Sequence, residues 1–383
     1  MKAHYSTLPL FLLISAAALA AESDYRPVRC ARRLPYEGAP LYAKGVELPP
    51  PDFALGEAFP QPIREKLDRA VAEAATLTGA RQLTVAIANR QGFYAHDGEK
   101  LLYWASVGKA FTATAVLQLV EEGKLRLSDP LSKWFPRFPN AVAITLDDLL
   151  LHAAGIFSAN EDLAARKTPR YRSPQESVEI SARHGAMFCP GQNWRYSNTG
   201  YTLLGEILAA VEGKPYPQVV RDRILGRLAP GPLRVVGPDD PLAEVAPLLP
   251  KDGSDPAMSP SWAGAAGSVV GNAGGMLRFW HALLTGKLLS PEATARRFAR
   301  LYPMFDSGTY YGQGVMIYDV PGVLWLGHSG GTPGAKAVVA YSPADQAFVA
   351  VALNTDGPAE AVANLLLKTL REAEKPEAAA PLP

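Results

Sequence analysis

The stretch that decides the fold is SVGKAFTATAVLQLVEE, residues 106–122, the strongest predicted helix of the chain. The residues that repeat at the spacing of one helical face are Val107, Ala110, Phe111, Thr114, Leu117 and Val120. Gly123 follows the last turn, where a glycine commonly ends a helix. Because alanine and valine cover most of the remaining surface, we expect this helix to be buried on nearly all sides.

Strand patterns lie on both sides of this helix. The runs that read as strands are 83–88, 93–95, 323–326, 335–341 and 348–353. Helical patterns at 63–77 and 360–373 flank them, and mainly helical patterns with proline-rich loops fill 124–300.

This order predicts an α+β fold. Two early and three late strands can form one antiparallel sheet of five or more strands, flanked by N- and C-terminal helices, with the helical middle as an inserted domain. We assign the sheet domain to 57–105 plus 301–374 and the mainly helical domain to 106–300. The proline-rich residues 21–56 predict an extended N-terminal arm, and the Ala/Pro-rich residues 375–383 predict a disordered tail.

Composition and charge narrow the class of protein. The chain has 383 residues, 48% of them hydrophobic, which is enough for a sizeable core. Lysine and arginine number 38 against 37 aspartates and glutamates, with no basic stripe, so we expect no nucleic-acid partner. Residues 1–20 read as a signal peptide ending in Ala18-Leu19-Ala20, a small-x-small cleavage site. This predicts export to the periplasm, with no stable membrane anchor after cleavage.

Cys30 and Cys189 are the two cysteines of the chain. In an oxidising compartment they could pair and tie the N-terminal arm to the body of the protein. Pairing requires their Cα atoms to lie within about 7 Å, and the alternative is two free thiols. The sequence leaves both open.

Ser106 and Lys109 form an S-x-x-K pattern at the start of the buried helix. A spacing of three residues places both side chains on one helical face. A serine hydroxyl needs a base to become a strong nucleophile, and burial near a helix N-terminus lowers the pKa of a lysine towards that role. The alternative is a helix-capping serine beside a solvated lysine.

Ser329 is a second candidate nucleophile, because residues 327–331 read GHSGG and match G-x-S-x-G. A helix should follow such a serine, but Pro333-Gly334 and a strand pattern follow it. No histidine occurs after His328, so the expected downstream partner is missing. We reject this interpretation. We also reject a phosphate-binding loop at Gly108-Lys109, since the earlier glycine and the Ser/Thr of that motif are replaced.

Two further polar segments favour Ser106. Tyr196 follows a polar loop, and a buried phenol beside a cation is expected to have a depressed pKa and to shuttle protons. Asn198 can bind a substrate amide and hold the lysine. Residues 328–330 (His-Ser-Gly) lie at the edge of a predicted strand, where a glycine lets a substrate backbone approach closely. The alternative for the first segment is a loop tyrosine and a helix-capping asparagine.

Together these elements resemble the serine β-lactamase and penicillin-binding-protein superfamily, whose signatures are S-x-x-K, Y-x-N or S-x-N, and K/H-[ST]-G. The matching residues are Ser106 and Lys109, Tyr196 and Asn198, and His328, Ser329 and Gly330. The resemblance covers roughly residues 57–372, and it implies a sheet domain and a helical domain with the site between them.

The resemblance also implies a mechanism. Ser106 would attack a carbonyl and form an acyl-enzyme, while Lys109 and Tyr196 would exchange its proton and deliver one to the leaving group. The backbone N–H groups of Ser106 and Gly331 would form the oxyanion hole. Asn198, His328, Ser329 and Gly330 would bind the substrate. The resemblance implies no metal and no other cofactor.

With a tyrosine at position 196, the chain resembles class C β-lactamases, low-molecular-weight D-Ala-D-Ala carboxypeptidases, D-amino peptidases and family VIII esterases. It differs here from class A enzymes. Class C β-lactamases carry a lysine where this chain has His328, and a histidine would be only partly charged at pH 7. We therefore expect a small-molecule or peptide substrate, cleaved by a D-Ala-D-Ala carboxypeptidase or D-peptidase. The alternatives are a short-chain esterase, a weak β-lactamase, or a non-catalytic binding protein that keeps the fold.

Two positions depart from the family pattern. The family usually has His-Thr-Ser-Gly where residues 152–155 read His-Ala-Ala-Gly, and these positions are interpreted as mostly structural. Gly108 inside the S-x-x-K turn either costs helix stability of about 1 kcal/mol or lets another segment pass close by. The sequence does not decide between them.

Overall fold

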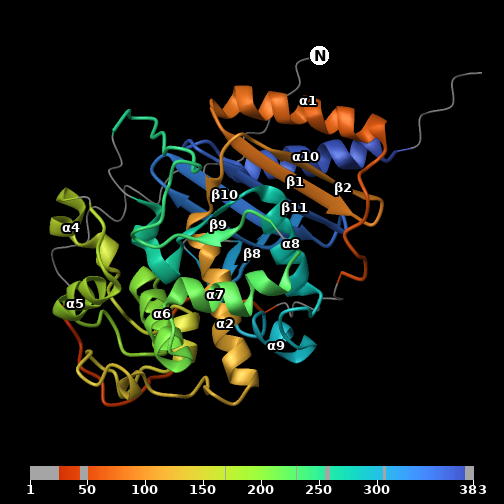
Figure 1. The fold of residues 1–383 in the computed structure, drawn as a ribbon. Helices are drawn as coiled ribbons and strands as arrows, with labels where there is room; N and C mark the ends of the chain where they lie inside the picture. The colour runs from red at the N-terminus through yellow and green to blue at the C-terminus, as the bar shows by residue number, and fades with distance from the viewer. Residues whose placement is uncertain are drawn as a thin grey trace, which may run out of the picture.

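The computed structural model describes residues 26–43, 51–168, 170–229, 231–254, 259–304 and 308–375. The predicted signal peptide and all but the first residue of the predicted tail lie outside these ranges. Figure 1 shows helices packed on both sides of a large sheet. The predicted α+β fold is therefore confirmed.

The large sheet has eight strands, and every neighbouring pair is antiparallel. Their order across the sheet is β2 (Gly92–Asp97), β1 (Leu83–Asn89), β11 (Ala347–Leu353), β10 (Ala335–Ser342), β9 (Val323–Thr332), β8 (Met316–Val320), β7 (Thr309–Tyr311) and β6 (Tyr302–Pro303). A small second sheet has the order β3 (Leu102–Tyr103), β5 (Val269–Gly271) and β4 (Arg234–Val235).

Helices α1 (Gln61–Thr78) and α10 (Ala359–Ala373) pack together and cover one face of the sheet (Figure 1). Helix α8 (Ala273–Leu284) packs against β1, β2 and β11. Alternation along β1 serves both faces, because Val85 and Ile87 join the core under α1 while Ala86 joins the core that contains α8. Strand β1 is therefore buried along its whole length.

Most of the remaining helices lie on the side of the sheet away from α1 (Figure 1). They are α2 (Lys109–Glu121), α3 (Leu146–Leu150), α4 (Leu163–Lys167), α5 (Pro174–His184), α6 (Asn198–Glu212), α7 (Tyr216–Arg223) and α9 (Pro291–Arg296). The predicted division into a sheet domain and a helical domain stays a prediction, although α8 comes from the span assigned to the helical domain and packs on the sheet. None of the helices in the described part of the chain is long and apolar enough to cross a bilayer.

The stretch that opened the sequence argument forms two elements. A 3-10 turn at Ala105–Gly108 carries Ser106, and α2 begins at Lys109. Every residue of 109–119 is buried, which confirms the expectation of burial on nearly all sides. Strand β9 differs from its prediction, because it continues past 326 through the glycine-rich segment to Thr332. The side chains of this glycine-rich segment do not indicate a strand, but its backbone pairs with β10 as far as Thr332.

The described part of the N-terminal arm, 26–43 and 51–56, has no helix or extended strand. A disulfide joins Cys30 to Cys189, with 5.7 Å between their Cα atoms, so the choice left open by the sequence is settled in favour of pairing. Leu34 N–H donates to the Pro190 carbonyl, and Val28 N–H donates to the Ala186 carbonyl. The arm is thus bound along the segment that leads to Tyr196.

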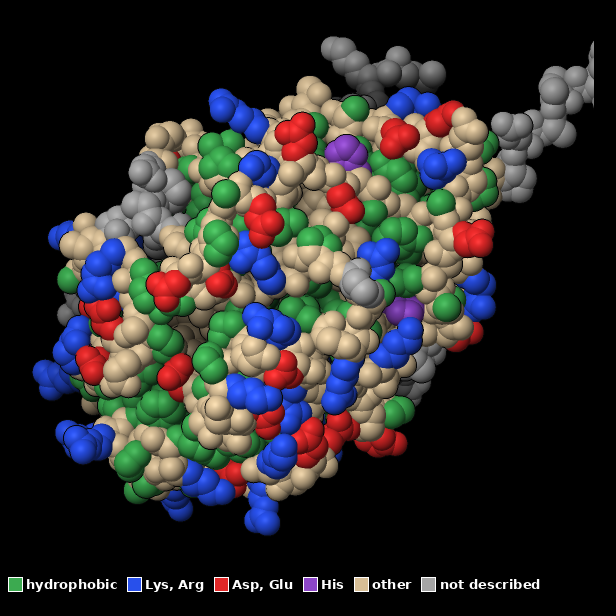
Figure 2. Space-filling view, viewed as in Figure 1, with side chains coloured by type: hydrophobic (Ala, Val, Ile, Leu, Met, Phe, Trp, Pro, Cys, Tyr) green, Lys and Arg blue, Asp and Glu red, His purple; other side chains and the backbone are tan. Residues whose placement is uncertain are grey.

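Figure 2 shows one face of the molecule, on which lysine and arginine side chains alternate with aspartate and glutamate. The mixture agrees with the balanced composition of the chain.

Candidate active site

Ser106 lies in the 3-10 turn that connects β3 to α2. The preceding Ala105 has a φ of 45°, a left-handed conformation that is uncommon for any residue except glycine and that often occurs at functional sites. Lys109 Nζ lies 3.1 Å from Ser106 Oγ, so the predicted pair is formed.

Lys109 is fully buried, and its Nζ is held between three oxygens. Besides Ser106 Oγ, the amine donates to Asn198 Oδ1 and to the Ala266 carbonyl, each at 2.7 Å. Burial lowers the pKa of Lys109 well below its usual 10.5. A neutral amine has two N–H groups and one lone pair. Once Lys109 is deprotonated, the two acceptors at 2.7 Å can take both N–H groups, which leaves the lone pair for the Ser106 hydroxyl proton.

Tyr196 completes the group from the other side. Lys109 Nζ lies 4.7 Å from the centroid of the Tyr196 ring, and the phenol hydrogen-bonds the Ser106 side chain. The predicted depression of the Tyr196 pKa is wrong. Desolvation of this partly buried ring raises the pKa of the phenol above its usual 10. Tyr196 is therefore a neutral phenol at pH 7.

Asn198 begins α6, but Ser197 is the residue that caps the helix, since its side chain accepts from the Gly200 N–H. The amide of Asn198 is thus available to the site. Its Oδ1 binds Lys109, as predicted, and its Nδ2 donates to Asn160 Oδ1 at 2.9 Å. This contact with the lysine is confirmed, whereas a contact with substrate stays a prediction.

Strand β9 runs beside the Ser106 turn. A Cβ added to Gly330 would lie 2.2 Å from the Trp104 carbonyl oxygen and 2.8 Å from the Ser106 nitrogen. The protein's own backbone therefore lies against this glycine, and the close approach of a substrate stays a prediction. Beyond Gly327 the pairing of β9 with β8 stops, while its pairing with β10 continues. The oxyanion hole assigned to the N–H groups of Ser106 and Gly331 stays a prediction.

His328 points to the same face of β9 as Gly330 and is fully buried. Its Nε2 lies 3.3 Å from the Tyr311 hydroxyl, and its Nδ1 lies 2.6 Å from the Ser329 carbonyl. Burial, reinforced by Lys109, lowers the pKa of His328 to about 3. The histidine is therefore neutral at pH 7, where the sequence had suggested partial charge, and it offers no cation to a substrate.

The Ser329 hydroxyl lies on the opposite face of β9 and donates to Met316 Sδ at 3.7 Å. Ser329 sits within a strand and not at a strand-to-helix turn, which agrees with its rejection as a nucleophile. Its predicted role in binding substrate stays untested.

The sequence missed one contact of the site and left a second feature open. The Ala266 carbonyl that binds Lys109 is a backbone group, for which residue type gives no signal. A Cβ added to Gly108 would lie 2.8 Å from Gly267 Cα. Gly108 therefore lets the segment that contains Ala266 pass close by, and this decides the question that the sequence left open.

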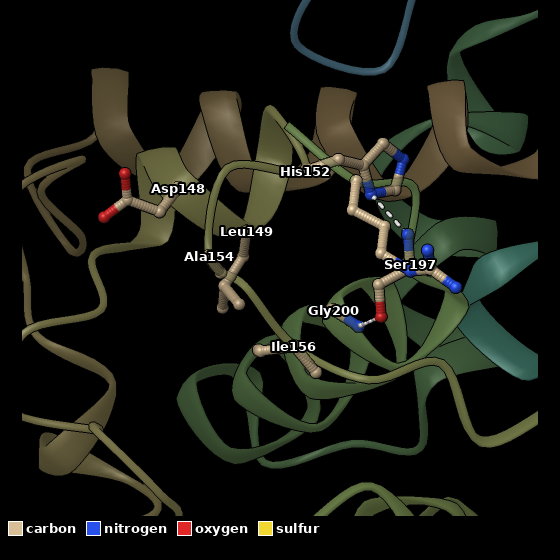
Figure 3. A pocket seen from close by; sticks show the side chains of 8 residues that line it. Asp148, Leu149, His152, Ala154, Ile156, Ser197 and Gly200 are labelled. Carbon is tan, nitrogen blue, oxygen red and sulfur yellow. Dashed lines mark hydrogen bonds between the residues drawn. The ribbon is translucent and has the colours of Figure 1, made fainter. Parts of the chain in front are cut away.

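A small pocket lies behind the Tyr196 segment. The residues that line it are Asp148, Leu149, His152, Ala154, Ile156, Arg195, Ser197 and Gly200. Figure 3 shows His152 pointing towards the Ser197 backbone, whose N–H it binds. Among the described residues, no cluster of three His, Cys, Asp or Glu side chains could hold a metal ion.

Solved structures similar to this chain include two amide hydrolases. D-amino acid amidase from Ochrobactrum anthropi SV3, complexed with L-phenylalanine amide, is 25% identical with a TM-score of 0.71, over 82% of this chain and 99% of that one. D-stereospecific amidohydrolase from Streptomyces sp. is 26% identical with a TM-score of 0.69, over the same shares of the two chains.

Two of the similar curated proteins carry penicillin-binding-protein names. PbpX of Bacillus subtilis (strain 168) is 30% identical over 285 residues, which is 71% of this chain and 67% of that protein. Penicillin-binding protein 4 of Amycolatopsis lactamdurans is 27% identical over 65% of this chain and 71% of that protein. The Beta-lactamase family model matches residues 61–372, the span that holds every residue of the site described above. The chain therefore belongs to the Beta-lactamase family, and it is a serine hydrolase of the superfamily that includes the penicillin-binding proteins.

Proposed function

We propose that this protein hydrolyses an amide bond through an acyl-enzyme on Ser106, with a D-amino acid amide or short D-peptide as the substrate. The observation that carries the proposal is the hydrogen bonding of Lys109. Its two N–H groups are taken by Asn198 and the Ala266 carbonyl, so its lone pair faces the Ser106 hydroxyl. Lys109 is then a base ready to accept the serine proton.

The reaction balances with the groups of the site. The Ser106 proton passes to Lys109 Nζ while Oγ forms a bond to the substrate carbonyl carbon. The tetrahedral oxyanion is held by the N–H groups of Ser106 and Gly331. Collapse breaks the bond to the leaving nitrogen, which takes a proton from the Tyr196 phenol. Lys109 returns its proton to Tyr196. In deacylation Lys109 takes a proton from water as the water oxygen bonds to the acyl carbon, and Ser106 Oγ receives that proton when its bond to the carbon breaks and the acid leaves.

Because His328 is neutral, it favours a substrate whose leaving group carries no charge. A carboxylate beside this strand would meet a buried imidazole whose pKa is about 3, and not a fixed cation. An amide or ester has no such charge to satisfy. The two amide hydrolases among the similar structures, each covered over 99% of its length, support the same substrate class.

A D-Ala-D-Ala carboxypeptidase is the second candidate. The penicillin-binding-protein names of the curated relatives favour it. Its substrate has a C-terminal carboxylate, so this candidate requires another source of positive charge near the site.

We also propose that the protein is exported to the periplasm. The signal-like residues 1–20 support this location. The disulfide between Cys30 and Cys189 is a further support, because such bonds persist in oxidising compartments.

The test is the intact mass of the mature protein and of its Ser106→Ala variant after incubation with a fluorophosphonate and, separately, with a penicillin. We expect both probes to add to the wild type and neither to the variant. Turnover is then compared on D-phenylalanine amide, L-phenylalanine amide and a D-Ala-D-Ala peptide. Faster cleavage of the D-amide supports the proposal, and faster cleavage of the D-Ala-D-Ala peptide supports the second candidate. An unmodified wild type that is folded would contradict both.

A further inference from the structure

His152 lies directly after α3, two residues past its last helical residue, and is buried. Its backbone has a φ of 58°, in the left-handed region. A side chain larger than glycine is uncommon there, and asparagine, aspartate and histidine are the residues that tolerate it best. Burial, with Lys109 and His328 nearby, lowers the pKa of His152 well below its usual 6.5, so the ring is neutral.

His152 binds the chain on both sides of Tyr196. Its carbonyl oxygen accepts from the Arg195 N–H at 3.0 Å, and its Nδ1 accepts from the Ser197 N–H at 3.1 Å. Because Nδ1 accepts a hydrogen bond, the ring proton must lie on Nε2. The ring centroids of His152 and Tyr196 are 4.2 Å apart. One residue therefore fixes the backbone before and after Tyr196 and also packs against its ring.

Helix α3, which precedes His152, is itself held in place by the N-terminal arm. Asp148, in α3, forms a capping box with Thr145 and accepts from both Arg33 Nε and Arg33 Nη2. The Asp148 side chain is fully buried. Arg33 belongs to the arm that the disulfide holds in place, so the position of α3 is fixed from two directions.

We propose that His152 is a positioning residue that holds the Tyr196 phenol against Ser106 and Lys109. The proposal rests on the proposed function, since it acts through the proton transfer assigned to Tyr196. The contacts that carry it are the two hydrogen bonds that flank Tyr196 and the ring contact between the two side chains. A residue that only filled space would not need an acceptor at Nδ1 or a left-handed backbone.

The test compares His152→Gly with His152→Asn. Glycine adopts the left-handed conformation freely but has no acceptor for the Ser197 N–H. Asparagine tolerates that conformation and places Oδ1 the same number of bonds from Cα as Nδ1 of histidine. Both variants lose the ring, so the difference between them isolates the acceptor. We expect His152→Gly to lower kcat by about 10- to 100-fold, the scale of a misplaced proton donor, with KM changed by less than about threefold. His152→Asn should recover most of that loss.

Both variants are also combined with Tyr196→Phe. If His152 acts through Tyr196, His152→Gly should lower kcat little further in the Phe background, because the two effects are coupled. Additive losses, a wild-type kcat in His152→Gly, or an equal loss in His152→Asn would overturn the inference. A fully active Tyr196→Phe would instead overturn the proposed role of Tyr196. The ring ¹⁵N shifts of the wild-type enzyme give a check without mutation, since a proton on Nδ1 at neutral pH would also overturn the inference.

Discussion

Replacing Gly108 with alanine tests whether the close packing beneath the nucleophile positions Lys109. Gly108 has a φ of −55° and a ψ of −23°, so alanine fits the backbone without strain. Its added Cβ would lie 2.8 Å from Gly267 Cα, against the 3.4 Å at which ordinary contacts begin, so the two segments must separate by about 0.6 Å. The obstacle is backbone and cannot rotate away.

The expected loss of stability and of acylation rate can both be derived from this separation of the two segments. Overpacking of a buried contact costs about 1–3 kcal/mol, and replacing a helical glycine with alanine returns up to about 1 kcal/mol. We expect the free energy of unfolding to fall by about 1–2 kcal/mol. The Ala266 carbonyl precedes Gly267 and accepts from Lys109 Nζ at 2.7 Å. A movement of the same size would stretch this bond to about 3.3 Å, outside the normal range, and slow acylation of Ser106 by about tenfold.

Urea unfolding measures the first effect, and the rate of fluorophosphonate labelling of Ser106 measures the second. Gly200→Ala is the matched control, because Gly200 lies in α6 and its added Cβ would be 3.7 Å from the Leu149 carbonyl, an ordinary contact. That variant should be as fast as the wild type and up to about 1 kcal/mol more stable. A Gly108→Ala enzyme that is as stable and as quickly labelled as Gly200→Ala would refute the reasoning.

Three further predictions follow from the disulfide and from the buried titratable groups. Replacing Cys30 and Cys189 together by serine removes a bond between residues 159 apart in sequence, and should lower the free energy of unfolding by about 2–4 kcal/mol in urea; an unchanged midpoint would contradict this. Protonation of Lys109 removes the base, so kcat/KM should rise with pH on the acid side and reach its plateau well below the usual lysine pKa of 10.5. Because the pKa of Tyr196 is raised, kcat/KM should stay on this plateau to at least pH 10. A kcat/KM that still rises at pH 10.5 would show an unperturbed lysine. His328 is neutral in the folded protein down to about pH 3, so the unfolded chain binds the extra proton and stability should fall as pH drops from about 6.5 towards 3; equal denaturation midpoints at pH 7 and pH 4.5 would count against it.

The sequence pattern predicted five of the eight strands of the large sheet and the two helices that cover one of its faces. The apolar run of β1 and the helical spacing of α1 gave elements that the structure extends by only a few residues. Strand β9 was predicted too short because Gly327, Gly330 and Gly331 have low strand propensity and no side chains to pack. Their strand conformation depends on pairing with β10, which is a contact between distant residues and leaves no local signal.

The groups of the active site also divide into those that the sequence could identify and those that it could not. Ser106, Lys109, Tyr196 and Asn198 could be identified because their chemistry resides in side chains at recognisable spacing. The Ala266 carbonyl could not, since every residue has such a group. The direction of the Tyr196 pKa was predicted wrongly because the prediction considered only a cation beside the phenol. Desolvation is the largest influence on this phenol, and its extent cannot be judged from one sequence.

Burial explains why these groups work together, and it also sets a cost. Burial lowers the pKa of Lys109 well below its usual 10.5, so folding favours the neutral amine, and keeping this amine away from water costs free energy. Net stability is a small difference between large opposing contributions, so the packing of the rest of the fold must offset this cost. This packing is visible in the structure, because α2 is buried along nearly its whole length and every residue of β1 and β11 is buried. The extended core is therefore part of the catalytic apparatus, since a looser core would let water in and return the proton to Lys109.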